Sequence, residues 1–155
     1  MKPLLSVLLL LIGPRLETVA PDRLAAAITA ESQSAPVSPH EWERLMVAIA
    51  ENESRLSQRI ADGRCKPLEC DRGRAKGLWQ LHRNTLNRDS WAKQDGDIEL
   101  QAHLASEQLK RAYWTCKRSG VNWLTGTINA YAGRRCSDTS WPGLQARVAT
   151  YGRLR

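Results

Sequence analysis

A helix-periodic apolar face runs through the first third of the chain and contains one carboxylate. At about 100° per residue, the face collects the apolar side chains of Trp42, Leu45, Met46, Ile49 and Leu56. Glu53 falls inside this apolar stripe, whereas Glu43 and Glu51 project away from it, into water or onto another surface. The pattern therefore predicts an amphipathic helix with an acid on its apolar side.

The start and end of this helix carry their own signals. Ser38 can cap the helix, with Pro39 at the first position and Glu41 three residues after the cap. Asp62-Gly63 is a turn dipeptide. We expect the helix to begin at Pro39 and to end shortly before Asp62.

Three more helices are expected in the second half of the chain. One begins at Asp97-Ile98-Glu99 and stops at Ser119-Gly120, one begins near Asn122, and the last follows Trp141-Pro142. Between Gly63 and Lys76 the sequence is short, charged and punctuated by glycine, which indicates a loop or a small hairpin arm. The expected fold class is mainly α.

The length and the net charge of the chain limit the number of domains and the class of partner. A chain of 155 residues is one domain by length, and its formal net charge of +7 favours an anionic partner. The basic residues are scattered rather than gathered into a recognised nucleic-acid module, so we expect no nucleic acid as partner. An anionic bacterial envelope fits this charge, and we expect a monomer.

The four cysteines allow three disulfide pairings. We predict that Cys65 pairs with Cys70 and that Cys116 pairs with Cys136. The alternative, a zinc site, disagrees with the spacings, because zinc ribbons use pairs separated by two residues. We therefore expect no metal and no cofactor, and disulfides favour an oxidising compartment.

The N-terminus resembles an export signal. Nine residues from Leu4 to Ile12, eight of them apolar, follow Lys2, which is too short for a membrane-spanning helix but suits a signal peptide. An N-terminal helix packed on the domain is the alternative. We expect a signal peptide or hydrophobic segment over 1–20, an extension and linker over 21–40, and the main domain over 41–155.

The chemistry of Glu53 has two interpretations at this stage. A carboxylate on an apolar face can be the partner in a salt bridge. It can also lie at the end of a helix, where the angle calculated at 100° per residue no longer describes the backbone. It can also be a partly desolvated acid, because burial disfavours the charged form and lets a carboxyl group deliver a proton to a leaving group.

Three short motifs carry a resemblance to a known family. They are Glu53-Ser54, then Gly77-Leu78-Trp79-Gln80, then Asn129-Ala130-Tyr131-Ala132-Gly133. In this order they resemble the lysozyme-like soluble lytic transglycosylase (SLT) family, whose pattern runs Glu-Ser, Gly-Leu-Met-Gln, Ala-Tyr-Asn-Ala-Gly. The resemblance covers roughly Glu41 to Arg155. This chain departs from the pattern at Trp79, which replaces Met, and in lacking an Asn between Tyr131 and Ala132.

The resemblance implies an α+β lysozyme-like fold, in which a helical lobe and a small loop or hairpin lobe enclose a cleft. It implies that Glu53 is the catalytic acid and that Ser54, Gln80 and Tyr131 bind substrate. Gln80 would orient sugar, against the alternative of a buried structural glutamine. Tyr131 would lie by the acid; if the missing Asn has shifted the register, Tyr131 is a core aromatic and Asn129 contacts substrate instead.

The implied reaction is cleavage of the β-1,4 bond between N-acetylmuramic acid and N-acetylglucosamine in peptidoglycan. Most glycosidases use a second carboxylate, and the candidates Asp62, Glu69 and Asp71 lie in the loop arm. The resemblance instead implies one Glu that acts as acid and then as base, giving either a lytic transglycosylase or a lysozyme.

Two functions other than that of an enzyme stay open. One is a lysozyme-like wall-binding module without catalysis, and the other is a basic nucleic-acid-binding domain. For the enzyme we expect a periplasmic or secreted location, or a phage-encoded protein that acts at the cell wall.

Overall fold

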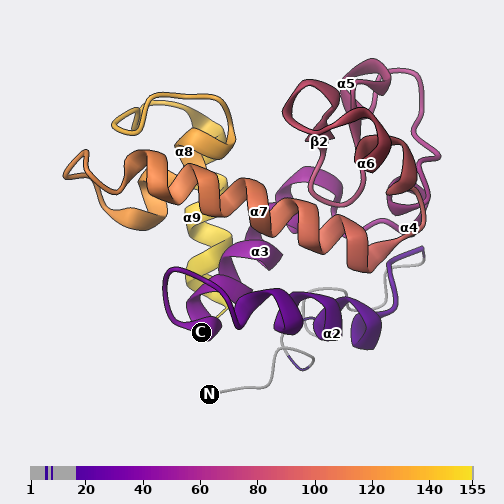
Figure 1. Cartoon of the computed structure of the whole chain (residues 1–155), viewed down its shortest axis with the longest axis horizontal. Coiled ribbons are helices and arrows are strands. Elements are labelled where there is room, and N and C mark those ends of the chain that lie inside the picture. The colour runs from indigo at the N-terminus through magenta and orange to yellow at the C-terminus, as the bar shows by residue number, and fades with distance from the viewer. Residues whose placement is uncertain (1–5, 7, 9–16, 155) are drawn as a thin grey trace.

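A computed structural model describes residues 6, 8 and 17–154 of the chain (Figure 1). Of the predicted signal segment, 1–20, only residues 6, 8 and 17–20 are described, and the rest lies outside the described residues. The larger helices are α2 (Pro21–Ser32), α3 (Pro39–Ser54), α7 (Ile98–Cys116), α8 (Trp123–Tyr131) and α9 (Pro142–Arg153). The smaller elements are α4 (Gln58–Ala61), α5 (Cys70–Gly73), β1 (Ala75–Lys76), β2 (Leu81–His82), η1 (Arg83–Thr85) and α6 (Arg88–Lys93).

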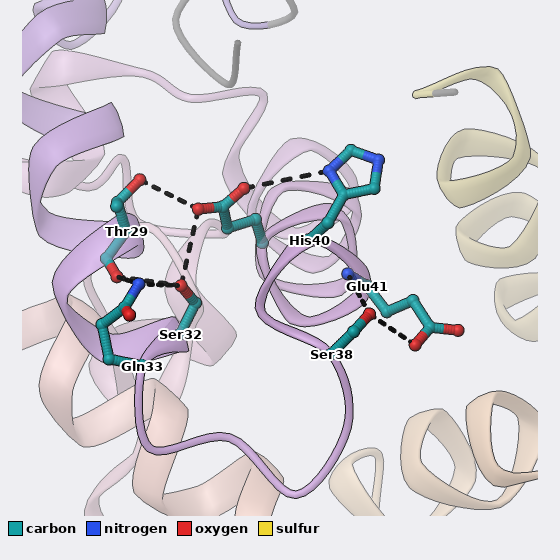
Figure 2. Close-up of polar contacts among 7 residues, drawn as sticks. Thr29, Ser32, Gln33, Ser38, His40 and Glu41 are labelled. Atoms are coloured by element: carbon teal, nitrogen blue, oxygen red, sulfur yellow. Dashed lines mark hydrogen bonds and ion pairs between the residues drawn. The ribbon is translucent and has the colours of Figure 1, made fainter. Parts of the chain in front are cut away.

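The central helix, α3, begins as its capping signals predict. The Ser38 hydroxyl accepts a hydrogen bond from the Glu41 backbone N–H and donates one to the Glu41 carboxylate at 2.6 Å. The predicted stripe is buried, and so are Val47, Ala48 and Ala50, because other elements cover the middle of α3 on several sides. Glu43, outside the stripe, meets α2, because its carboxylate accepts a hydrogen bond from the hydroxyl of Thr29, which is labelled in Figure 2.

The end predicted for this helix, near Asp62, was wrong. The helix stops at Ser54, because Arg55 (φ 53°) and Leu56 (φ 56°) adopt left-handed backbone conformations. The Ser54 hydroxyl accepts from the Leu56 N–H, and the Val19 N–H donates to the Leu56 carbonyl. A short helix, α4, then runs to Ala61.

The other long helices begin where their capping residues stand. Asp97 caps α7 by accepting from the Leu100 N–H at 2.9 Å, and Asn122 caps α8 by accepting from the Leu124 N–H at 3.0 Å. Helix α7 packs against both α2 and α8, while α9 packs against α3 and α8. In Figure 1, α8 and α9 lie at one end of α7, and β2, α5 and α6 lie toward the other.

The small lobe holds the predicted arm. Strands β1 and β2 pair antiparallel, with Ala75 opposite His82, and the Gly77–Gln80 segment forms the turn between them. Glu69 fastens the arm to α4, because the Arg59 guanidinium donates to both of its oxygens, at 2.6 and 2.8 Å. The α+β fold, with a helical lobe and a small hairpin lobe, is therefore confirmed.

The segment before α3 belongs to the same core. Leu24 and Ile28 of α2 are fully buried, and Arg23 of α2 forms an ion pair with Glu99 of α7. The helical lobe therefore includes α2 and extends further toward the N-terminus than the boundary expected at residue 41.

Both predicted disulfides are present, Cys65 with Cys70 and Cys116 with Cys136. The second ties the end of α7 to the loop that follows α8. No helix among the described residues combines the length and apolar character needed to cross a membrane.

Candidate active site

A cavity of about 260 Å³ opens between the two lobes at the end of α3. Three of the predicted site residues, Glu53, Gln80 and Tyr131, share it. The other lining residues are His82, Asn84, Thr85, Gln108, Ala132 and Gly133. The cavity thus joins the last turn of α3 to the β1–β2 hairpin, to α7 and to the end of α8.

Glu53 is partly shielded from water and forms an ion pair. Its side chain is 22% exposed, and the Nη2 of Arg147 on α9 donates a hydrogen bond to its Oε1. The Arg147 side chain is itself only 12% exposed. The Glu53 carboxylate therefore has the salt-bridge partner that one interpretation expects, and it also lines the cavity.

Tyr131 lies beside Glu53 and joins the helical lobe to the hairpin. Its hydroxyl donates to the Trp79 carbonyl at 2.6 Å. Burial, and next the negative charge of Glu53, raise the pKa of Tyr131 well above its ordinary value of 10.0. The phenol therefore keeps its proton under ordinary conditions, and its oxygen can still accept a hydrogen bond.

Gln80 is fixed by the hairpin turn. Its backbone has a positive φ of 49°, and its side-chain amide donates to the Gly77 carbonyl at 3.0 Å. The same Nε2 lies 3.3 Å from the Cys70 sulfur, so the Cys65–Cys70 disulfide borders the residue. Gln80 is half-buried and lines the cavity, so the structure does not make it a fully buried structural glutamine.

The comparison with protein families agrees with this geometry. Residues 27–145 match the family model described as the transglycosylase SLT domain. This chain belongs to the transglycosylase SLT domain family. Membership indicates an enzyme that cleaves glycosidic bonds of peptidoglycan. The search of curated proteins and the search of solved structures found no match.

One departure from the SLT pattern is accommodated inside the core. Trp79, in the place of the usual Met, is fully buried, and its indole N–H donates to the Met46 carbonyl of α3 at 2.9 Å. The larger side chain therefore fastens the hairpin turn to the helix that carries Glu53.

Two predicted site residues do not line the cavity of this SLT domain. Ser54 is buried, and its hydroxyl donates to the Ala50 carbonyl at 2.9 Å. Asn129 is fully buried, and its amide donates to the carbonyls of Cys136 and Asp138, at 3.0 and 2.7 Å. Both side chains are bonded within the fold, where a substrate in the cavity does not reach them without rearrangement.

Gly133, the last residue of the third motif, has a conformational reason to be glycine. A Cβ added there would meet nothing within 4 Å, but the backbone has a φ of +70°. That left-handed conformation favours a residue without a side chain. Gly133 lines the cavity, so it shapes the rim through its backbone.

The candidate second carboxylates are held elsewhere. Asp62 pairs with Arg64 at 2.8 Å, Glu69 pairs with Arg59, and Asp71 faces a neighbouring cavity. Among the described residues that line the SLT cavity, Glu53 is the only carboxylate.

The structure adds residues that sequence reasoning missed. His82, Asn84, Thr85 and Gln108 line the cavity from the hairpin, η1 and α7, and no local pattern marks them. Arg147 lies two residues beyond the family match and 94 positions from Glu53, so only the packing of α9 on α3 identifies it.

Proposed function

We propose that this protein is a lytic transglycosylase in which Glu53 acts first as general acid and then as general base. The observation that carries the proposal is the position of Glu53, the only carboxylate among the described residues of a cavity that it shares with Gln80 and Tyr131. One carboxylate at the reacting bond fits a mechanism in which the substrate supplies the second group.

The proposed reaction has two proton transfers. Glu53 gives its proton to the glycosidic oxygen O4, which joins C1 of N-acetylmuramic acid to C4 of N-acetylglucosamine. The C1–O4 bond breaks, and the N-acetylglucosamine 4-hydroxyl leaves. The Glu53 carboxylate then takes the proton of the muramyl 6-hydroxyl as O6 bonds to C1. The product is a 1,6-anhydro sugar, and Glu53 is protonated again.

Neighbouring groups support these steps in the proposal. Arg147 faces the negative charge that appears on Glu53 when its proton leaves. The Gln80 amide oxygen can accept from a sugar hydroxyl or acetamide while its N–H groups stay with the hairpin turn. The Tyr131 oxygen can accept a hydrogen bond from substrate while its hydroxyl donates to the Trp79 carbonyl.

The test is Glu53→Gln, which keeps the shape of the side chain but removes the acid. We expect loss of peptidoglycan cleavage with unchanged folding, measured by wall clearing and circular dichroism. Glu51→Gln, two residues away and outside the cavity lining, is the matched control and should keep activity. An active Glu53→Gln enzyme would rule out the assignment.

Mass spectrometry of the released muropeptides identifies the reaction type. Anhydro products, lighter by one water than hydrolysis products, support the transglycosylase. Reducing-end products would make the protein a lysozyme with the same acid. Binding to walls without released products would make it the catalytically inactive wall-binding module.

The proposal also includes export. The substrate lies outside the cytoplasm, and the two disulfides suit an oxidising compartment. We propose a periplasmic or secreted enzyme, with a phage-encoded enzyme acting at the wall as the alternative source.

A further inference from the structure

We infer that Asn129, Trp141 and Gly143 form a positioning unit that holds Arg147 against Glu53. The inference rests on the proposed role of Glu53. It adds the residues that fix the position of the Glu53 carboxylate. The unit links the loop after α8, residues 132–141, to the first two turns of α9.

Asn129 organises the loop from inside. Its amide nitrogen donates to the carbonyls of Cys136 and Asp138, and its amide oxygen accepts from the Trp141 indole N–H at 2.8 Å. The side chain is fully buried, so its three hydrogen bonds are protected from water. Asn129 thereby fixes both the path of the loop and the orientation of the Trp141 ring.

Trp141 in turn supports Arg147. The guanidinium carbon of Arg147 lies 5.1 Å from the centre of the indole ring, within the range of a cation–π contact. Arg147 Nη1 also donates to the Gly143 carbonyl at 2.7 Å, while Nη2 donates to Glu53. The guanidinium is therefore held by a ring face, a carbonyl and the carboxylate.

This arrangement leaves a donor unsatisfied. Arg147 Nε is buried and has no hydrogen-bond partner among the described residues. Such a group destabilises the folded state, and in native proteins it calls for an explanation. Holding the charge partner of a catalytic acid supplies that explanation.

Gly143 provides the space that the unit needs. A Cβ added to Gly143 would overlap the Trp141 ring at Cζ3 and would lie 2.8 Å from Arg147 Nη1. An alanine there would displace the indole ring, the guanidinium or both. Gly152, in the same helix, offers a matched control, because a Cβ added there meets nothing within 4 Å.

The first experiment measures kcat and KM on soluble glycan strands for Gly143→Ala and Gly152→Ala. Because small misplacements of catalytic groups cost about tenfold to a hundredfold in rate, we expect kcat of Gly143→Ala to fall by that factor with little change in KM. Gly152→Ala should keep the wild-type kcat. An unchanged kcat in Gly143→Ala, or a loss confined to KM, would overturn the inference.

Rescue separates positioning from general damage to the fold. Arg147→Lys keeps a cation near Glu53 and should retain more activity than Arg147→Met, measured at a temperature where circular dichroism shows both variants folded. Equal activities of Arg147→Lys and Arg147→Met would show that the charge next to Glu53 is irrelevant.

The second experiment does not depend on catalysis. Melting temperatures are measured for Glu53→Gln, Arg147→Met and the double variant, first in the wild-type and then in the Gly143→Ala background. Two residues in contact give non-additive effects, so we expect coupling in the wild type and near-additivity with Gly143→Ala. Equal coupling in both backgrounds would overturn the inference. If Glu53→Gln proved active, the proposed function would fail, and this cycle would still decide whether the unit positions Arg147.

Discussion

At Tyr131 a single hydroxyl joins the helix that ends at the cavity to the turn that carries Gln80. Its hydrogen bond to the Trp79 carbonyl is short, at 2.6 Å, and its ring lines the cavity beside Glu53. The missing Asn after Tyr131 therefore has not turned this side chain away from the acid. Asn129 instead faces the loop after α8.

We expect Tyr131→Phe to lower both stability and turnover. The Trp79 carbonyl loses its donor, which costs about 0.5–1.5 kcal/mol of unfolding free energy, and the loosened turn moves Gln80. Turnover on peptidoglycan should fall by about tenfold, a barrier increase near 1.4 kcal/mol. Urea unfolding and wall clearing measure the two effects. Tyr113→Phe, outside the cavity lining, is the control, and a silent Tyr131→Phe would rule out this role.

The raised pKa of Tyr131 gives the same residue a pH signature. Above the ordinary phenol pKa of 10.0 the unfolded chain loses this proton, while the folded protein keeps it. The contribution of the Tyr131 hydroxyl to the free energy of unfolding is therefore fully present below pH 10.0. It is lost as the pH rises toward the pKa that Tyr131 has in the folded state. The stability difference between wild type and Tyr131→Phe should shrink over this alkaline range in thermal melts.

Among the elements, α4 and the arm after it are joined by the ion pair between Arg59 and Glu69. The Arg59 guanidinium, and next the Lys66 backbone N–H, lower the pKa of Glu69 from its ordinary 4.5 to about 2. Because the folded-state pKa is depressed, the stabilisation is present above pH 4.5 and is lost as the pH falls toward 2.

We therefore predict a pH-dependent effect of Glu69→Gln. The variant should melt below wild type at neutral pH, and the difference should decrease between pH 4.5 and 2. Thermal melts across this range provide the measurement. Asp89→Asn, on the exposed first turn of α6, is the control for a general loss of charge. A difference that stays constant with pH would contradict the ion-pair explanation.

The second disulfide joins two elements that also frame the site. Cys116 ends α7, and Cys136 lies in the loop that Asn129 holds. Replacing both Cys116 and Cys136 by Ala should cost about 2–4 kcal/mol of unfolding free energy, measured with urea.

Replacing both Cys65 and Cys70 by Ala should lower the free energy of unfolding by less. The Cys65–Cys70 disulfide closes a loop of sequence separation 5, whereas Cys116–Cys136 closes one of 20. Thiol titration of the denatured, unreduced protein provides the control. Four free thiols would contradict both pairings.

For the whole molecule, the net charge of +7 governs the encounter with an anionic wall. Charges on the protein surface are screened over about 10 Å at 0.1 M salt and about 3 Å at 1 M. We predict that raising the salt concentration slows the clearing of intact walls more than the cleavage of short, uncharged glycan fragments. Initial rates on both substrates test this. Equal salt dependence would show that the surface charge does not assist binding to the wall.

The sequence alone determined the features whose causes are local. Ser38, Asp97 and Asn122 start helices because a cap bonds to backbone N–H groups two or three residues away. The helical period similarly predicted the buried face of α3 and the inward position of Glu53, and the three motifs predicted the family.

Tertiary structure decided what depends on segments far apart. The pairing of the 17–19 segment with Leu56 and Ser57 accompanies the end of α3 at Ser54, which the helical period could not predict. The sequence made Asn129 a candidate for substrate contact, but in the structure the loop after α8 encloses its side chain. Arg147 became the partner of Glu53 only because α9 packs on α3, since a charge pair across 94 positions is fixed by packing and leaves no periodic trace in the sequence.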